Sequence, residues 1–263
     1  MMKLYFISGL GADRRVFSLL DLSFCEPVFI DWVKPDPTDT LCSYAAKLRA
    51  LIPEEAPYVV GLSLGGMLAS EMAKADPKLK AILISSNRTY LEFPGYFKVF
   101  KYVPLYKWIP GTVMKNMQSL YTYSFGVKDP VQKKVLYDII KDADIPFVRW
   151  AIGAIMHWDN TVSSSNIVQI HGTGDRLFRV SNTRPDYIIE GGSHTMTMDK
   201  HVEVSAILKR LIFEEGPPTA DRRRSFGNEQ TTTTDDRPRT TDRRRPTADR
   251  RRSLGDEQPE ITE

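Results

Sequence analysis

The sequence predicts an α/β fold, in which a mostly parallel sheet of about six strands has helices on both faces. Short apolar runs that end in glycine or polar residues recur along the first 213 residues. Segments with helical spacing of apolar residues alternate with these runs. This alternation is typical of parallel sheets, because parallel strands need a long crossover that is usually a helix.

Six apolar runs are the expected strands. The first, "KLYFISGLG" at residues 3–11, ends in glycines as a buried strand often does. The others are residues 26–32, 58–62, 80–86, 166–172 and 184–192.

Three segments between or after these strands are expected to be helices. Residues 40–52 begin with Thr40 as a helix cap and carry apolar residues at helical spacing. The second and third segments are residues 64–75 and 196–213.

Residues 87–165 interrupt the alternation and predict a mostly helical insert. Prolines divide its first part, which is rich in aromatic residues: Tyr90, Phe93, Tyr96, Phe97, Phe100, Tyr102, Tyr106 and Trp108. Because the insert leaves and rejoins the sheet between two strands, we interpret it as a cap that holds an apolar substrate pocket and excludes water. The alternative is an ordinary helical excursion with a small core of its own.

The chain is expected to consist of a folded domain at residues 1–215 and a disordered tail at residues 216–263. The tail has almost no large apolar residues, and "PTADRRRSFGNEQ" recurs in it as "PTADRRRSLGDEQ". Such a segment cannot bury enough apolar surface to offset the entropy of ordering. Its 11 arginines face 10 acidic residues, which favours a solvated tail over a surface for acidic partners or membranes.

Composition excludes several classes of protein. The formal net charge of +3 is too small to indicate a nucleic-acid-binding protein. No apolar stretch is long enough for a transmembrane helix, and Cys25 and Cys42 are too few for a disulfide framework. We expect a cytoplasmic protein without a cleaved secretory signal, whose oligomeric state the sequence leaves open.

Ser63 is the candidate nucleophile. It lies in "GLSLGG" between a predicted strand and a predicted helix, with Gly61 and Gly65 on either side. A sharp strand-to-helix turn exposes the hydroxyl and needs neighbours without side chains. The positive end of the helix that follows favours a developing oxyanion. A tight turn without catalytic function is the alternative interpretation.

The other groups of a serine nucleophile site are expected later in the chain, with the acid before the histidine. His194 follows the last strand in "EGGSH" and is the candidate base; His157, His171 and His201 are interpreted as structural. Asp175, in "QIHGTGD" after the preceding strand, is the candidate acid that orients the imidazole. Asp159 and Asp186 are weaker alternatives.

Two backbone N–H groups are needed to bind an oxyanion. We expect one from Leu64, directly after the nucleophile. The second is expected from Leu10 in the loop "SGLGAD", whose glycines permit close approach of the backbone.

With these motifs in this order, residues 3–213 resemble an α/β-hydrolase. The resemblance implies a nucleophile at Ser63, a base at His194 and an acid at Asp175. The chain departs from the family in starting almost at the family's third strand, and in having Ser8-Gly9 where a His-Gly pair is frequent.

The expected activity is hydrolysis of an ester or thioester of an apolar acyl group, through an acyl-enzyme on Ser63. No cofactor or metal is expected, since no cluster has metal-ligand spacing, and the expected partner is a small-molecule substrate. Two alternatives stay open: a non-catalytic ligand sensor or scaffold with this fold, and an enzyme that uses the same three residues to cleave a carbon–carbon bond.

Overall fold

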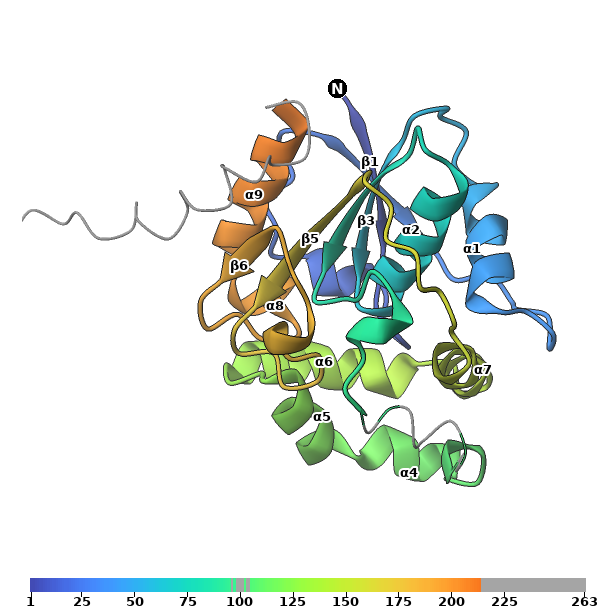
Figure 1. Cartoon of the computed structure of the whole chain (residues 1–263). Coiled ribbons are helices and arrows are strands. Elements are labelled where there is room, and N and C mark those ends of the chain that lie inside the picture. The colour runs from blue at the N-terminus through green and yellow to red at the C-terminus, as the bar shows by residue number, and fades with distance from the viewer. Residues whose placement is uncertain (96, 98–101, 103–104, 214–263) are drawn as a thin grey trace, which may run out of the picture. The chain divides into compact units, whose positions relative to one another are not determined.

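The computed structural model describes residues 1–95, 97, 102 and 105–213. Its centre is a six-stranded sheet in the order β2-β1-β3-β4-β5-β6 (Figure 1). The strands are β1 (Lys3–Ile7), β2 (Glu26–Ile30), β3 (Tyr58–Leu62), β4 (Lys80–Ile84), β5 (Ile167–Gly172) and β6 (Tyr187–Ile189). Every neighbouring pair is parallel. The predicted α/β fold is therefore confirmed.

Five of the strands are shorter than the apolar runs that predict them, and β3 has the predicted bounds. For example, β1 ends at Ile7, and the glycines at positions 9 and 11 belong to the loop that follows. β6 covers only three residues of the run at 184–192. Pairing ends before the glycine loops, so these loops are free to project from the carboxyl edge of the sheet.

Helices cover both faces of the sheet (Figure 1). On one face, α1 (Leu41–Arg49), α2 (Leu64–Ala75) and α7 (Ile145–Met156) contribute to one apolar core. On the other face, η1 (Arg14–Phe17), α8 (Met196–Asp199) and α9 (His201–Phe213) contribute to a second core. The two cores explain why the central strands are apolar on both sides.

Two of the predicted helices match the structure closely, and one does not. Thr40 caps α1 in a reciprocal pair of hydrogen bonds with Ser43, and α2 has the predicted bounds. The prediction of one helix at 196–213 is wrong. The segment forms two helices, α8 and α9, separated by Lys200, which adopts φ −130° and ψ 33°. Its N–H still bonds the Met196 carbonyl, but its extended φ turns the chain before α9 begins.

The insert between β4 and β5 is helical, as expected. It contains η2 (Tyr90–Glu92), η3 (Leu105–Lys107), α4 (Gly111–Asn116), α5 (Gln118–Phe125), α6 (Pro130–Asp142) and α7, and η4 (Val180–Asn182) follows β5. Asp129 and Asp144 accept hydrogen bonds from the first turns of α6 and α7, each of which has a proline near its start. α6 and α7 lie across the carboxyl ends of the strands (Figure 1).

The aromatic residues of the insert divide between core and surface. Phe93 is buried, and its ring stacks on Phe97 at 4.9 Å. Trp108 and Tyr102 are 73% and 81% exposed. Tyr96, Phe100, Pro104 and the tail at 216–263 lie outside the described residues.

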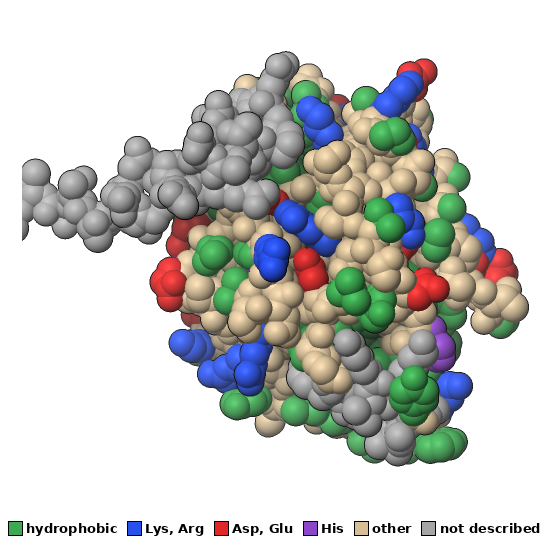
Figure 2. Space-filling view, in the orientation of Figure 1, with side chains coloured by type: hydrophobic (Ala, Val, Ile, Leu, Met, Phe, Trp, Pro, Cys, Tyr) green, Lys and Arg blue, Asp and Glu red, His purple; other side chains and the backbone are tan. Residues whose placement is uncertain are grey.

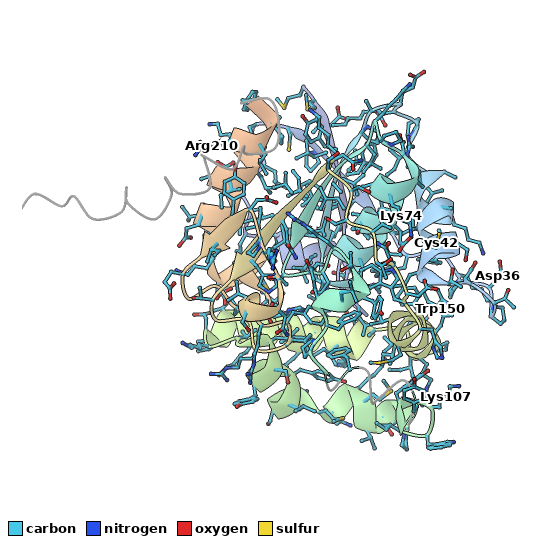
Figure 3. All side chains as sticks on the ribbon, viewed as in Figure 1. Asp36, Cys42, Lys74, Lys107, Trp150 and Arg210 are labelled. Atoms are coloured by element: carbon cyan, nitrogen blue, oxygen red, sulfur yellow. The ribbon has the colours of Figure 1, made fainter. Side chains whose placement is uncertain are left out.

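A buried carboxylate ties the end of the insert to the sheet domain. Glu71 on α2 accepts a 2.6 Å hydrogen bond from the Trp158 indole, and Lys74 pairs with it at 2.6 Å. Figure 3 shows Lys74 beside Cys42 of α1. Both cysteines are free thiols, Cys25 buried and Cys42 exposed.

On the face shown in Figure 2, basic and acidic side chains are interspersed, and hydrophobic side chains gather along the lower edge, where Figure 1 places α4 and α5.

Candidate active site

The candidate residues follow four different strands at the carboxyl edge of the parallel sheet. Leu10 comes after β1, Ser63 after β3, Asp175 after β5 and His194 after β6. Because the carboxyl ends of parallel strands lie at one edge, residues far apart in the chain are brought to the same place.

Ser63 lies in a strained turn between β3 and α2. Its φ of 52° and ψ of −116° are rare for a residue with a side chain. The turn requires the glycines around it: a Cβ on Gly61 would lie 2.2 Å from the Gly65 carbonyl oxygen, and one on Gly65 would lie 2.2 Å from the Ile7 carbonyl oxygen. The backbone of Ser63 is held by its N–H bond to Ile84 and by the Ser86 hydroxyl.

Hydrogen bonds join the three side chains in one chain. His194 Nε2 lies 2.9 Å from Ser63 Oγ, and His194 Nδ1 lies 2.9 Å from Asp175 Oδ2. His194 and Asp175 are buried, and Ser63 is half-buried. An imidazole in this position can accept the serine proton at Nε2 while the carboxylate holds the proton at Nδ1.

Asp175 is held as a carboxylate. Its Oδ1 accepts the backbone N–H groups of Leu177 and Phe178, each at 2.9 Å. Burial alone would favour the neutral acid, but the charge of His194 and the hydrogen bonds of His171 and His194 outweigh it and hold the pKa of Asp175 well below its usual range. The acid therefore has the protonation state that orienting an imidazole requires.

Backbone N–H groups border the serine on two sides. Leu64 is the first residue of α2, where N–H groups have no acceptor within the helix. The loop with Leu10 passes close to the serine, since a Cβ on Gly9 would lie 3.4 Å from the Ser63 Cβ. Both N–H groups thus belong to backbone segments that border the nucleophile.

The other histidines and aspartates take different positions. His157 Nδ1 lies 2.8 Å from the Gly153 carbonyl oxygen of α7, and His201 Nδ1 lies 2.9 Å from the Met198 carbonyl oxygen of α8. Asp186 pairs with Arg88, and Asp159 is exposed. His171 is fully buried, and its Nε2 lies 2.6 Å from the Phe178 carbonyl oxygen and 3.4 Å from Asp175 Oδ2.

Two phenylalanines that the sequence reasoning missed enclose the imidazole of His194. The rings of Phe125 and Phe178 each lie 5.3 Å from it. Phe125 ends α5, and its carbonyl accepts the backbone N–H of His194 at 3.1 Å. The sequence hint at this position is Gly126, because a glycine often ends a helix. In the structure it has φ 76° and ends α5 directly after Phe125. The insert therefore contacts the candidate base directly.

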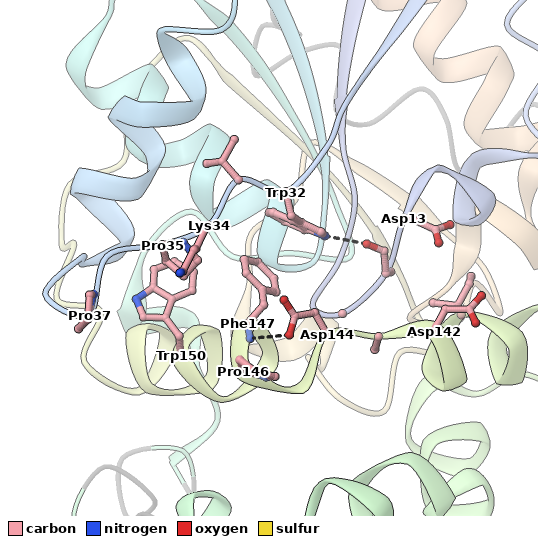
Figure 4. A pocket seen from close by; sticks show the side chains of 15 residues that line it. Asp13, Trp32, Lys34, Pro35, Pro37, Asp142, Asp144, Pro146, Phe147 and Trp150 are labelled. Atoms are coloured by element: carbon pink, nitrogen blue, oxygen red, sulfur yellow. Dashed lines mark hydrogen bonds between the residues drawn. The ribbon is translucent and has the colours of Figure 1, made fainter.

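A cleft of about 810 Å³ opens beside the loop of Leu10 (Figure 4). The loops after β1 and β2 form one side, and the end of α6 with α7 forms the other. Its aromatic residues are Trp32, Phe147 and Trp150. The end of α6 and α7 belong to the insert at 87–165 that was expected to cap the pocket, whereas none of the described residues of its aromatic first part at 90–108 lines this cleft.

Two negative findings apply to the described residues alone. No group of three or more His, Cys, Asp or Glu residues among them is arranged to hold a metal ion. None of the helices within the described ranges has both the length and the apolar character needed to cross a membrane.

Comparisons with known proteins support the fold. No family model matches the sequence, and no curated protein matches it. A carboxylesterase structure from the thaumarchaeon Nitrososphaera gargenis matches with a TM-score of 0.63 and 13% identity, over 80% of this chain and 89% of that one. An esterase from Thermogutta terrifontis matches with a TM-score of 0.62 and 15% identity, over 81% and 90%.

A third solved structure is described as an N-acyl homoserine lactonase. It matches with a TM-score of 0.58 and 14% identity, over 81% of this chain and 89% of that one. At these identities the likeness establishes the architecture, so the chain has the α/β-hydrolase fold.

Proposed function

We propose that this protein is a serine hydrolase that cleaves an ester or thioester of an apolar acyl group through an acyl-enzyme on Ser63. The observation that carries the proposal is the hydrogen-bonded chain Asp175–His194–Ser63, with its two 2.9 Å bonds. The structural neighbours described as esterases and as a lactonase support ester hydrolysis as the reaction class.

In the first half of the reaction, Ser63 Oγ attacks the substrate carbonyl carbon while its proton moves to His194 Nε2. The carbonyl oxygen becomes an oxyanion, which the N–H groups of Leu10 and Leu64 stabilise. The bond to the leaving alcohol or thiol then breaks, and the leaving group takes the proton from His194.

In the second half, His194 Nε2 removes a proton from a water molecule, whose oxygen attacks the acyl carbon. The Ser63 ester bond breaks, Ser63 regains its proton, and the carboxylic acid product leaves. Asp175 keeps its negative charge throughout and stabilises the imidazolium.

The nucleophile is tested with a fluorophosphonate probe, which labels activated serines. We expect labelling of the wild type, loss of labelling in Ser63→Ala, and unchanged labelling in the control Ser18→Ala, whose serine is exposed at the end of η1. Equal labelling of wild type and Ser63→Ala would show that the nucleophile is misassigned.

Turnover separates a hydrolase from a ligand sensor with the same fold. Short-chain 4-nitrophenyl esters should be hydrolysed by the wild type, and His194→Ala should lower kcat by at least about 10³-fold. A folded protein that is labelled by the probe but turns over no ester would contradict the proposed activity.

A further inference from the structure

From the cleft beside the Leu10 loop, we infer that the acyl group of the substrate carries an aromatic ring, which binds between the loop after β2 and α7. This inference rests on the proposed function and adds a substrate class to it.

The lining of the cleft begins two residues along the chain from the glycine that borders Ser63. Gly9 lies next to Ser63, and Gly11, two residues further along the same loop, lines the cleft. Consecutive Cα atoms are 3.8 Å apart, so these two glycines are separated by at most about 7.6 Å. A short alkyl linker from the carbonyl carbon can span this distance.

The order of the strands decides which part of the ester points into the cleft. Asp175 and His194 follow β5 and β6, on one side of β3 and its serine. The cleft is lined by the loops after β1 and β2, on the other side. The leaving group must lie at His194 to receive its proton. The carbonyl oxygen faces the N–H groups of Leu10 and Leu64, so the acyl group is the remaining substituent, and it is the one that can extend past the Leu10 loop towards the cleft.

The walls of the cleft offer flat apolar rings. The Trp32 and Phe147 rings are 4.8 Å apart, and the Phe147 and Trp150 rings are 5.5 Å apart, so the three form a continuous wall (Figure 4). Trp32 and Trp150 are half-buried and keep part of their surface open, whereas Phe147 is buried behind them.

The indole N–H groups of this wall are already bonded within the protein. Trp32 Nε1 donates to the Ala12 carbonyl at 2.7 Å, and Trp150 Nε1 donates to the Asp39 carbonyl at 3.1 Å. These bonds fix the ring orientations and leave only ring surface for a ligand. Ring surfaces bind another aromatic ring in offset or edge-to-face geometry, a gain that a linear alkyl chain lacks.

The charged residues of the cleft do not contradict an apolar ligand. Arg15 pairs with Asp13 at 2.6 Å and with Asp142 at 2.9 Å, so one cation offsets half of the charge of these two carboxylates. Lys34 and Asp144, of opposite charge, are exposed at the rim. The cleft therefore has an apolar interior and a charged edge.

The test compares 4-nitrophenyl esters that share one leaving group. The 4-phenylbutanoyl and decanoyl esters have equal numbers of acyl carbons. The 4-cyclohexylbutanoyl ester carries a saturated six-membered ring in place of the phenyl ring and so lacks the π system. We expect kcat/KM for the 4-phenylbutanoyl ester to exceed that of the decanoyl ester about tenfold and that of the cyclohexyl ester about threefold. A decanoyl or cyclohexyl ester that equals it would overturn the inference.

Variants locate the effect. Trp150→Leu, on α7 (Figure 3), should lower kcat/KM for the 4-phenylbutanoyl ester about tenfold, which is more than it lowers kcat/KM for 4-nitrophenyl acetate. Trp32→Leu should act in the same direction and replaces it if the first variant does not fold. The matched control is Trp108→Leu, since Trp108 is 73% exposed and outside the cleft. Equal effects of Trp150→Leu and Trp108→Leu would contradict the placement of the ring.

Failure of this inference differs from failure of the proposed function. Ser63-dependent hydrolysis of the acetate without preference for the aromatic ester would overturn only the acyl assignment. Absence of any ester hydrolysis and of probe labelling would overturn the proposed function and the inference together.

Discussion

His171 places a second imidazole beside Asp175. Its Nε2 donates to the Phe178 carbonyl oxygen at 2.6 Å, while the N–H of Phe178 donates to Asp175. Its Nδ1 is buried without a hydrogen-bond partner among the described residues. The side chain thus bonds the loop that carries the candidate acid, and we infer that His171 positions Asp175.

His171→Leu removes this bond, so kcat should fall about tenfold while KM for a short ester stays within about twofold. His171→Gln keeps an N–H donor and should restore kcat to within about threefold of wild type. Steady-state kinetics on both variants, corrected for the folded fraction, is the measurement. A purely structural role would lower stability in both variants and leave kcat per folded molecule unchanged.

The low pKa of Asp175 links stability to pH. In the unfolded chain an aspartate takes up a proton near pH 4, about 3.9 in peptides, whereas folded Asp175 stays ionised to lower pH. Between these two pKa values the unfolded state binds more protons, so stability rises with pH. The contribution of Asp175 is complete above about pH 5 and is lost as the pH falls below about 4.

Asp175→Asn should therefore be less stable than wild type at neutral pH, with a difference that shrinks at about pH 3.5. Urea unfolding at both pH values gives the two free energies of unfolding. Asp159→Asn, at an exposed site, is the control and should show a small difference at either pH. A difference that widens in acid would show that the sign of the pKa shift is wrong.

At the scale of elements, the turn from β3 to α2 depends on backbone contacts that side chains would block. A Cβ on Gly65 would lie 2.2 Å from the Ile7 carbonyl oxygen and 2.5 Å from the Ser8 carbonyl oxygen. Ile7 ends β1, and Ser8 begins the loop that contains Leu10. Neither backbone atom can move without displacing β1 or its loop.

Gly65→Ala should destabilise the protein by about 3 kcal/mol and abolish ester hydrolysis, because the clash is with backbone. Gly95→Ala is the matched control, since its Cβ would have no neighbour within 4 Å among the residues that the structure describes. Thermal unfolding and esterase assays on both variants make the comparison. A stable, active Gly65→Ala enzyme would mean that the serine turn is looser than its geometry implies.

The helix α5 is connected to the candidate base through Phe125. Its carbonyl bonds the His194 backbone N–H, and its ring covers the imidazole at 5.3 Å. The carbonyl bond survives any side-chain change, so a substitution tests the ring alone.

Phe125→Ala should lower kcat about tenfold, because it admits water to the imidazole and frees its orientation. Labelling by the fluorophosphonate should slow but persist, since Ser63 and His194 remain. Leu120→Ala on the same helix, at a residue that is 49% exposed, should leave kcat within about twofold. Equal rates for both variants would show that α5 does not shape the site.

At the scale of the whole molecule, the features that could be predicted are those that short stretches of sequence encode, namely the strands, the helix α2 and the candidate catalytic residues. Ser63 directly follows its strand, Asp175 and His194 follow theirs within five residues, and all three lie near glycine, so strand order brings them to one edge. The strand cores and the bounds of α2 are predictable for the same reason, because apolar periodicity and caps are local.

The cleft and the enclosure of His194 are not predictable in this way. Trp32 and Trp150 are separated by more than a hundred residues and belong to no shared motif, and they meet only because α7 packs over the loop after β2. Composition also does not distinguish the buried Phe93 from the exposed Trp108. The break at Lys200 is a local change in backbone dihedral angles, which helical periodicity does not reveal.

The tail at residues 216–263 should be dispensable for ester hydrolysis. Every residue in the proposed mechanism, and every described residue that lines the cleft, lies before Phe213. Deletion after Glu215 removes only the repetitive, nearly charge-balanced segment, so kcat/KM for 4-nitrophenyl acetate should stay within about twofold of the full chain. The truncated and full chains are compared in the same ester assay and by their solubility at equal concentration. A collapse of activity or solubility would show instead that the Arg-rich segment docks on the folded domain and helps to hold it in its active form.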